Sequence, residues 1–201
     1  MNTAAFQHFQ SVDPILFSVF KKISDKKTFT LTKSSDIFSD LVESIICQQL
    51  SNKAGSTIFL RFCALFPKHG FTPKQVLEMP DEKIRSTGPS WSKISYIKSI
   101  AWAVESGQLN LRTIDAKSDE DVIIELTKIR GIGRWTAEMF LMFTLGREDI
   151  FSFGDLGLRR AIMKLYKMKK EPTIRQMEKL TNRWKPYRTY AAKILWMSLE
   201  I

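Results

Sequence analysis

Two short segments carry residue types at a spacing that could do chemistry. In the first, from Ile129 to Trp135 (IRGIGRW), two glycines separate two stretches of helical periodicity. Glycine permits a tight turn and lets a phosphate approach backbone N–H groups closely. In the second, from Gly154 to Arg160, a single carboxylate, Asp155, begins the next predicted helix. A phosphate-binding turn followed by a lone acid is typical of an enzyme that breaks bonds in DNA.

The elements around these segments are predicted to be helices. Apolar residues at helical spacing predict helices over about 92–106, 119–127, 134–145, 155–166 and 173–184. The run 149–153 looks extended, but it has no evident pairing partner. The sequence therefore predicts an all-α protein.

The composition indicates an anionic partner. The chain has 201 residues, is 44% hydrophobic and carries a net charge of +10, with a pI near 9.6. Nucleic acid is the first candidate and a membrane surface the second, although a merely soluble basic protein would show the same excess. No apolar stretch is long enough to cross a membrane, and the N-terminus lacks the features of a secretion signal.

Each of the two segments also has an ordinary explanation. A glycine-broken turn between two helices accounts for the G-x-G pattern alone. An aspartate before an apolar helix is a common N-cap, which contributes about 1 kcal/mol to stability. The context of the segments decides between these interpretations.

The context resembles a known family. Residues 126–137 resemble the helix-hairpin-helix motif of the DNA glycosylase superfamily, and the chain is similar to the bacterial 3-methyladenine DNA glycosylase II (alkylpurine-DNA glycosylase) family. Three further segments match in order and spacing, so the resemblance runs from about residue 35 to the C-terminus. These segments are 41–51, 151–160 and 183–196.

The resemblance implies a two-lobed all-α fold with a DNA-binding cleft between the lobes. We expect one lobe over about 35–110 and a second over about 111–201, with residues 1–34 packing on the second. Larger relatives carry an extra N-terminal β-domain, and the roughly 34 residues before the match are too few to form one, so we expect a compact version.

The resemblance also implies a base-excision repair enzyme acting on duplex DNA that contains damaged bases. Such an enzyme flips an alkylated purine, 3-methyladenine or 7-methylguanine, out of the duplex and hydrolyses its N-glycosidic bond. Asp155 is the expected catalytic carboxylate, because it would stabilise the positive charge that develops on the sugar. Relatives that also nick the strand have a lysine where this chain has Trp135, so we expect a monofunctional glycosylase. The alternatives are the same fold acting on a neutral lesion such as hypoxanthine or ethenoadenine, and a non-catalytic DNA-binding protein.

Further residues are assigned by the same resemblance. Trp135, Trp196, Met139 and Tyr187 match or neighbour positions of the base pocket, although core packing is the usual role of an aromatic residue on a helix. Contacts with DNA are expected from the hairpin and from three polar side chains elsewhere. Gln49 would fill the gap left by the flipped base, Gln48 would contact the opposite base, and Lys93 would contact a phosphate; solvated surface side chains are the ordinary alternative. The hairpin residues are Gly131, Ile132, Gly133 and Arg134.

No cofactor is expected to be required. Hairpins of this family commonly hold a monovalent cation, sodium or potassium, through main-chain carbonyls, which by position would come from Thr127, Ile129 and Ile132. The family usually has proline where this chain has Arg130, which should loosen the turn slightly and add a charge beside it. By resemblance we also expect a monomer in the cytoplasm of a bacterium, associated with the nucleoid and not with a membrane.

Overall fold

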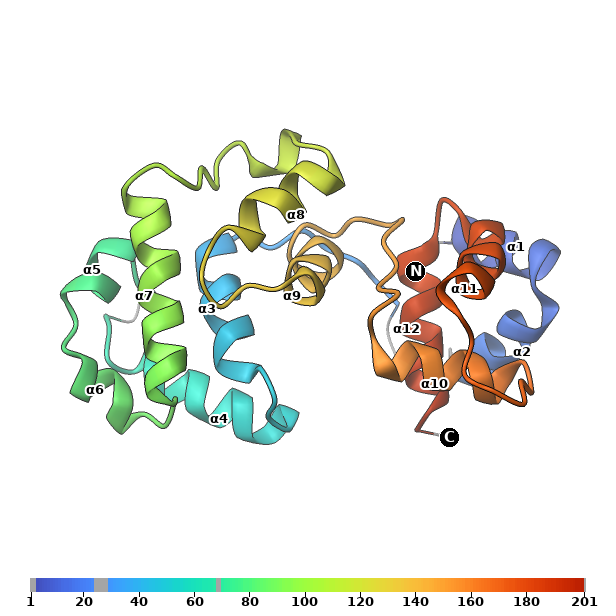
Figure 1. Cartoon of the computed structure of the whole chain (residues 1–201), viewed down its shortest axis with the longest axis horizontal. Coiled ribbons are helices and arrows are strands. Elements are labelled where there is room, and N and C mark those ends of the chain that lie inside the picture. Colours follow the sequence, from blue (N-terminus) through green and yellow to red (C-terminus); the bar gives the residue numbers. More distant parts are fainter. Residues whose placement is uncertain (1–2, 24–28, 68–69, 201) are drawn as a thin grey trace. The chain divides into compact units, whose positions relative to one another are not determined.

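The computed structural model of the chain describes residues 3–23, 29–67 and 70–200, which form helices joined by turns and loops (Figure 1). No strand occurs in these residues, which confirms the predicted all-α class. The helices group into two compact units. We call Ser34–Leu145 the hairpin lobe, and Met1–Lys33 together with Gly146–Ile201 the terminal lobe. Within the described ranges, every helix is too short or too polar to cross a membrane.

Side-chain caps define where several helices of the hairpin lobe begin. Ser51, Thr72, Ser90 and Ser118 each accept a hydrogen bond from the backbone N–H three residues later. The elements of this lobe are α3 (Ile37–Cys47), α4 (Asn52–Cys63), α5 (Pro73–Glu78), α6 (Asp81–Ser86), α7 (Trp91–Glu105), η1 (Ile114–Ala116), α8 (Asp119–Thr127), α9 (Arg134–Met139) and the π-helical turn η2 (Phe140–Thr144).

The core of the hairpin lobe is built on α3, which packs against α4, α7 and η2. Leu41, Val42, Ile45 and Ile46 are fully buried on α3, as the apolar spacing of this segment predicts. The sequence predicts one continuous α-helix over 134–145, whereas the structure has α9 followed by η2. The π-helical segment is a single turn of five residues, which is too short to change the apolar pattern, so the sequence does not reveal it.

The lobe boundary lies later in the chain than the sequence prediction places it. The predicted boundary after residue 110 is wrong, because 111–145 belong with α3 and α7 and the division falls between Leu145 and Gly146. α9 packs on α8, η2 packs on α3, and the side chain of Gln48 reaches the hairpin. These contacts join segments that are far apart in sequence, and helical periodicity carries no information about them.

The terminal lobe combines both ends of the chain. Its elements are α1 (Thr3–Val12), α2 (Pro14–Ile23), α10 (Leu156–Leu165), α11 (Ile174–Thr181), η3 (Asn182–Trp184) and α12 (Arg188–Ser198). α12 packs against both α10 and α2. The N-terminal residues that the structure describes thus lie with the C-terminal helices.

One buried carboxylate joins the two segments of the terminal lobe. Asp13 is 2% exposed and accepts hydrogen bonds from the backbone N–H of Leu16 at 3.0 Å, the hydroxyl of Tyr166 at 2.6 Å and Nε1 of Trp184 at 2.9 Å. Burial, together with the hydrogen bond to Asp13, raises the pKa of Tyr166 well above its usual range. Asp13 therefore begins α2 and at the same time links it to α10 and η3.

Candidate active site

The glycine-rich turn joins α8 to α9, and its two glycines serve the fold differently. Gly131 has a φ of 98°, and a Cβ there would lie 2.3 Å from Cγ of Tyr96 on α7. The left-handed backbone and the contact with Tyr96 both require glycine at 131. Gly133, the N-cap of α9, has a φ of −92°, and a Cβ there would meet no atom within 4 Å. The fold therefore does not require glycine at 133. The space beside Gly133, which we call its open face, suits the close approach of a ligand.

Two arginines flank this turn, and both have partners in the hairpin lobe. The guanidinium of Arg130 lies 5.8 Å from the ring centroid of Tyr96. The guanidinium of Arg134 donates two hydrogen bonds to Glu120 and one to Glu138, each 3.1 Å long. The hydrogen bonds to Glu120 raise the pKa of Arg134 and lower that of Glu120. A phosphate bound by Arg134 would have to compete with these carboxylates.

The two glutamines after α3 differ in their contacts and their exposure. The side-chain amide of Gln48 donates to the carbonyl of Gly131 at 3.1 Å and to Oγ1 of Thr136 at 3.3 Å, so it links the end of α3 to the hairpin. Gln49 is exposed and has a φ of 58°, which is in the left-handed region. The predicted contact of Gln48 with an opposite base remains a prediction. Gln49 is the more accessible of the two.

Lys93 is engaged within its own lobe. Its ammonium donates to the carbonyls of Ile46 at 2.8 Å and Gln48 at 2.7 Å, at the end of α3. Desolvation by burial lowers the pKa of Lys93, and the neighbouring Cys47 thiol opposes that shift. The described contacts of Lys93 are thus with main-chain carbonyls, and the phosphate contact that the family resemblance implies stays a prediction.

Asp155 and Trp196 lie together in the terminal lobe. Asp155 is the N-cap of α10, and its Oδ1 accepts from the backbone N–H of Leu158 at 2.7 Å. The same oxygen accepts from Nε1 of Trp196 at 3.0 Å. A Cβ at Gly157 would lie 3.0 Å from this oxygen and 3.2 Å from Trp196, so Gly157 leaves room for the pair. The half-buried carboxylate is thus both a helix cap and a group of fixed orientation.

Trp135 and Met139 lie one turn apart on α9. The side chain of Trp135 is 46% exposed, which is unusual for a residue of this size and leaves its ring accessible. Met139 borders an open cavity of about 360 Å³ between α3 and the α9–η2 segment. Burial raises the pKa of Glu43 in its lining, and Asp40 raises it further. The lining residues are Asp40, Glu43, Ser44, Cys47, Met139, Phe140, Phe143 and Thr144.

Tyr187 packs within the terminal lobe. Its ring centroid lies 5.6 Å from that of His8 and 6.3 Å from that of Tyr190. The residue is half-buried and directly precedes α12. The structure therefore shows a packing contact for Tyr187, and a role in a base pocket stays a prediction.

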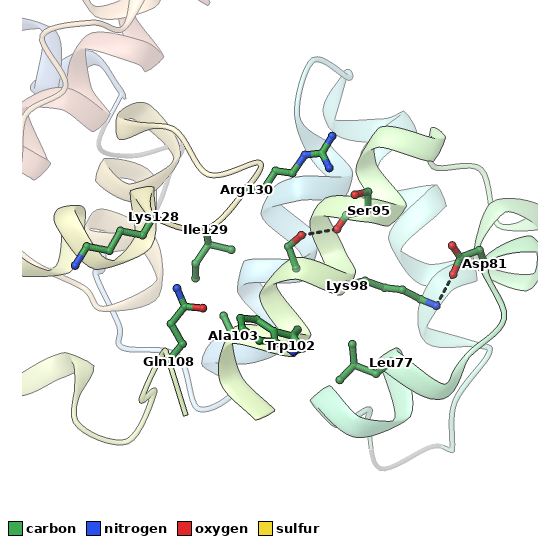
Figure 2. A pocket seen from close by; sticks show the side chains of 11 residues that line it. Leu77, Asp81, Ser95, Lys98, Trp102, Ala103, Gln108, Lys128, Ile129 and Arg130 are labelled. Carbon is green, nitrogen blue, oxygen red and sulfur yellow. Dashed lines mark hydrogen bonds and ion pairs between the residues drawn. The ribbon is translucent and has the colours of Figure 1, made fainter. Parts of the chain in front are cut away.

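A second open cavity, of about 630 Å³, lies beside the hairpin (Figure 2). Lys128, Ile129 and Arg130 form one part of its lining, and α5, α6, α7 and Gln108 supply the rest. Trp102 on α7 is 58% exposed there. Lys98 forms an ion pair with Asp81 in the same lining. The hairpin thus presents positive charge on this side as well.

The carbonyls predicted to hold a cation belong to the same hairpin. The carbonyl of Ile129 accepts a hydrogen bond from the backbone N–H of Ile132 at 3.1 Å, which closes the turn. In the described ranges no cluster of His, Cys, Asp or Glu side chains could hold a metal ion. A cation at this hairpin would therefore depend on main-chain oxygens.

Sequence reasoning missed several residues that support this site. Tyr96 contacts both Arg130 and Gly131, and Thr136 receives the amide of Gln48. Thr136 could have been noticed as a buried polar residue on an apolar helix face. Tyr96 gave no comparable signal, because an aromatic residue on a helix usually means core packing.

Comparison with known proteins identifies the class to which this fold and site belong. The HhH-GPD superfamily base excision DNA repair protein family matches residues 42–186. The chain belongs to this superfamily.

Relatives of known sequence are similar over nearly the whole chain. DNA-3-methyladenine glycosylase 1 of Schizosaccharomyces pombe is 33% identical, over 99% of this chain and 88% of that protein. The alkylbase DNA glycosidase-like protein mag2 of the same organism is 34% identical, over 96% of this chain and 91% of that protein.

Solved structures agree with these relatives. The S. pombe 3-methyladenine DNA glycosylase Mag1 in complex with abasic DNA has a TM-score of 0.88 and 33% identity, over 99% of this chain and 98% of that one. A DNA-3-methyladenine glycosidase from Bacillus halodurans has a TM-score of 0.82 and 36% identity, over 98% and 89% of the two chains. The helix-hairpin-helix glycosylase fold expected from the sequence is therefore confirmed.

Proposed function

We propose that this protein is a monofunctional DNA glycosylase that removes alkylated purines, such as 3-methyladenine and 7-methylguanine, from duplex DNA. One observation carries the proposal. In a chain similar along nearly its full length to 3-methyladenine DNA glycosylases, Asp155 is held by the N–H of Leu158 and by Nε1 of Trp196. Such a fixed carboxylate can stabilise the positive charge on a deoxyribose as its bond to the base breaks.

Cleavage of the N-glycosidic bond needs no general acid when the leaving base already carries a positive charge. The bond from C1′ to the base nitrogen breaks, and its electron pair leaves with the alkylated purine, which becomes neutral. Water then forms a bond to C1′, and its proton passes to the Asp155 carboxylate or to solvent. The products are a free base and an abasic site. Because Trp135 has no amine to attack C1′, the strand stays intact.

Surface features of the hairpin lobe support this function. The open face at Gly133 suits a phosphate, and the accessible Gln49 side chain suits insertion into the stack. The exposed ring of Trp135 can stack on an electron-poor base. The carboxyl groups of Asp40 and Glu43 near Met139 favour a cationic lesion over a neutral one such as hypoxanthine. We further propose that the protein acts as a monomer inside the cell, on damaged double-stranded DNA.

A monovalent cation at the hairpin is part of the proposal. The carbonyls of Thr127, Ile129 and Ile132 would hold sodium or potassium there and stiffen the turn. No cofactor takes part in the bond cleavage that we propose. If the cation matters, replacing potassium by a bulky organic cation at constant ionic strength weakens binding to DNA.

The experiment that tests the function compares base release by the wild type and by Asp155→Asn. Asparagine caps a helix about as well as aspartate, so the change removes charge and keeps the cap. We expect release of free alkylated purine by the wild type and a loss of at least roughly a hundredfold in the variant, with similar melting temperatures. Asp36→Asn is the matched control, because Asp36 caps α3 in the same way.

The outcomes separate the candidate functions. Intact DNA strands after base release, and no covalent complex trapped by borohydride, agree with a monofunctional enzyme. Release of neutral lesions only would support the alternative substrate class. If no lesion is released although DNA is bound, the protein is a non-catalytic DNA-binding protein and the proposal is wrong.

A further inference from the structure

A lysine from another helix fixes the end of α3. A helix leaves its last carbonyl groups without partners inside the helix. At α3, the carbonyls of Ile46 and Gln48 both accept from the ammonium of Lys93, at 2.8 and 2.7 Å. Lys93 lies in the first turn of α7, and its backbone N–H donates a hydrogen bond to the side chain of Ser90, the N-cap of that helix. A cation also suits this end of α3, because the helix dipole makes it negative.

These contacts surround a residue in an unfavourable conformation. Gln49 directly follows the second accepting carbonyl, and its φ of 58° is rarely adopted by residues other than glycine. The backbone N–H of Leu50 donates to the carbonyl of Cys47 at 3.2 Å and closes the turn. Such a conformation persists only where the surrounding contacts hold it.

The turn is held from two sides. Lys93 binds its carbonyls from α7, and the side-chain amide of Gln48 ties it to Gly131 and Thr136 of the hairpin. An ammonium has three N–H donors, and two of those of Lys93 are directed at α3. The Lys93 side chain is also partly buried. Both features favour a function within the protein over a surface contact with a phosphate.

We propose that Lys93 is a positioning residue that holds Gln49 in the geometry required to fill the gap left by a flipped base. The inference rests on the base flipping that belongs to the proposed function, because a gap in the stack arises only where a base leaves the duplex. Lys93 acts through the turn after α3 and does not neutralise a DNA phosphate.

Two properties distinguish positioning from a phosphate contact. Loss of a phosphate contact lowers the slope of log K against log salt concentration by about 1. Loss of positioning leaves that slope unchanged and reduces the distortion of the DNA. The test uses duplex DNA with a stable abasic analogue next to 2-aminopurine, whose fluorescence rises when neighbouring bases unstack.

The variants are Lys93→Met, Gln49→Ala and the double substitution. Methionine keeps an unbranched apolar side chain and removes both donors. Lys74→Met is the matched control, because Lys74 has a side chain that is 70% exposed and lies on α5 of the same lobe. Lys93→Gln, which retains a neutral donor, replaces Lys93→Met in every assay if the methionine variant does not fold.

We expect Lys93→Met to bind DNA with the wild-type salt slope but to produce little 2-aminopurine fluorescence. Single-turnover base release should fall about tenfold, and Gln49→Ala should cause a similar loss. The double variant should be no slower than the slower single variant, because the two residues act in one step. Lys74→Met should match the wild type throughout.

Contrary results have separate meanings. A salt slope lowered by about 1, or additive losses in the double variant, overturns the positioning function. So does a wild-type protein that leaves the fluorescence unchanged, because Gln49 then does not enter the stack. If the wild type unstacks the DNA through Lys93 but releases no base from any lesion, the positioning function stands and the proposed enzymatic function fails.

Discussion

At the scale of single residues, the two glycines of the hairpin separate a requirement of the fold from a requirement of binding. Gly131 combines a positive φ with a contact that leaves no space for a Cβ, whereas Gly133 has neither constraint. We expect Gly131→Ala to lower the free energy of unfolding by about 3 kcal/mol. Gly133→Ala should change it by about 0.5 kcal/mol or less and weaken DNA binding about tenfold, because the Cβ occupies the open face.

Chemical denaturation and a DNA-binding titration measure the two effects. Gly107→Ala is the control for backbone strain alone, because Gly107 has a φ of 78° and no atom within 4 Å of a Cβ. Its cost should be closer to 1 kcal/mol. A Gly133→Ala variant that unfolds as readily as Gly131→Ala would contradict this assignment.

The carboxyl group of Glu43 makes stability depend on pH. Desolvation by burial raises its pKa in the folded protein, and Asp40 raises it further. A carboxyl group with a raised pKa binds its proton more tightly in the folded state, so stability falls as pH rises from the unfolded to the folded pKa. Glu43→Gln should therefore be more stable than the wild type at pH 7, and the difference should shrink at pH 4. Urea denaturation at both values checks this sign.

At the scale of helices, Asp13 shows how one side chain can begin a helix and also join three elements. Asp13→Ala removes the cap of α2 and leaves Tyr166 and Trp184 without their acceptor. We expect the free energy of unfolding to fall by about 3 kcal/mol. Asp36→Ala removes a cap that is exposed and should cost only about 1 kcal/mol. Equal losses in denaturation experiments would show that the buried hydrogen bonds of Asp13 add nothing.

Most helices could be predicted because their signals are local. Thr72-Pro73, Ser118 and Asp155 all stand at helix starts in the structure. Helical spacing does not predict α1, since its three buried residues, Ala5, Phe6 and Phe9, are too few to establish a period. The Gln48 and Lys93 contacts join residues 83 and 45 positions apart, and no local pattern encodes such pairs.

At the scale of the whole molecule, charge is divided unequally between the lobes. The hairpin lobe contains as many acidic as basic residues, so the net charge of +10 lies in the terminal lobe. Three exposed lysines follow α10 in sequence, at positions 167, 169 and 170. If the protein binds DNA as proposed, the terminal lobe supplies the long-range attraction and the hairpin supplies fixed contacts.

Neutralising those three lysines should therefore slow association with DNA. We expect Lys167, Lys169 and Lys170, all changed to Gln, to lower the association rate several-fold at low salt and much less at high salt. The control changes Lys74, Lys83 and Arg112 of the hairpin lobe to Gln. Stopped-flow measurements over a range of salt concentrations compare the two triple variants. Equal slowing by both would show that the division of charge has no kinetic effect.

The terminal lobe is formed by the two ends of the chain, which has a consequence during synthesis. α1 and α2 leave the ribosome before the hairpin lobe, but η3 and α12, which pack on them, are translated after it. The hairpin lobe is continuous in sequence, so it can fold while synthesis is still in progress. Phe6, Phe9 and Phe20 are buried in the complete fold. Before η3 and α12 are synthesised, these side chains lack the contacts that those elements provide. A nascent chain stopped after residue 145 would therefore be the form most in need of a chaperone.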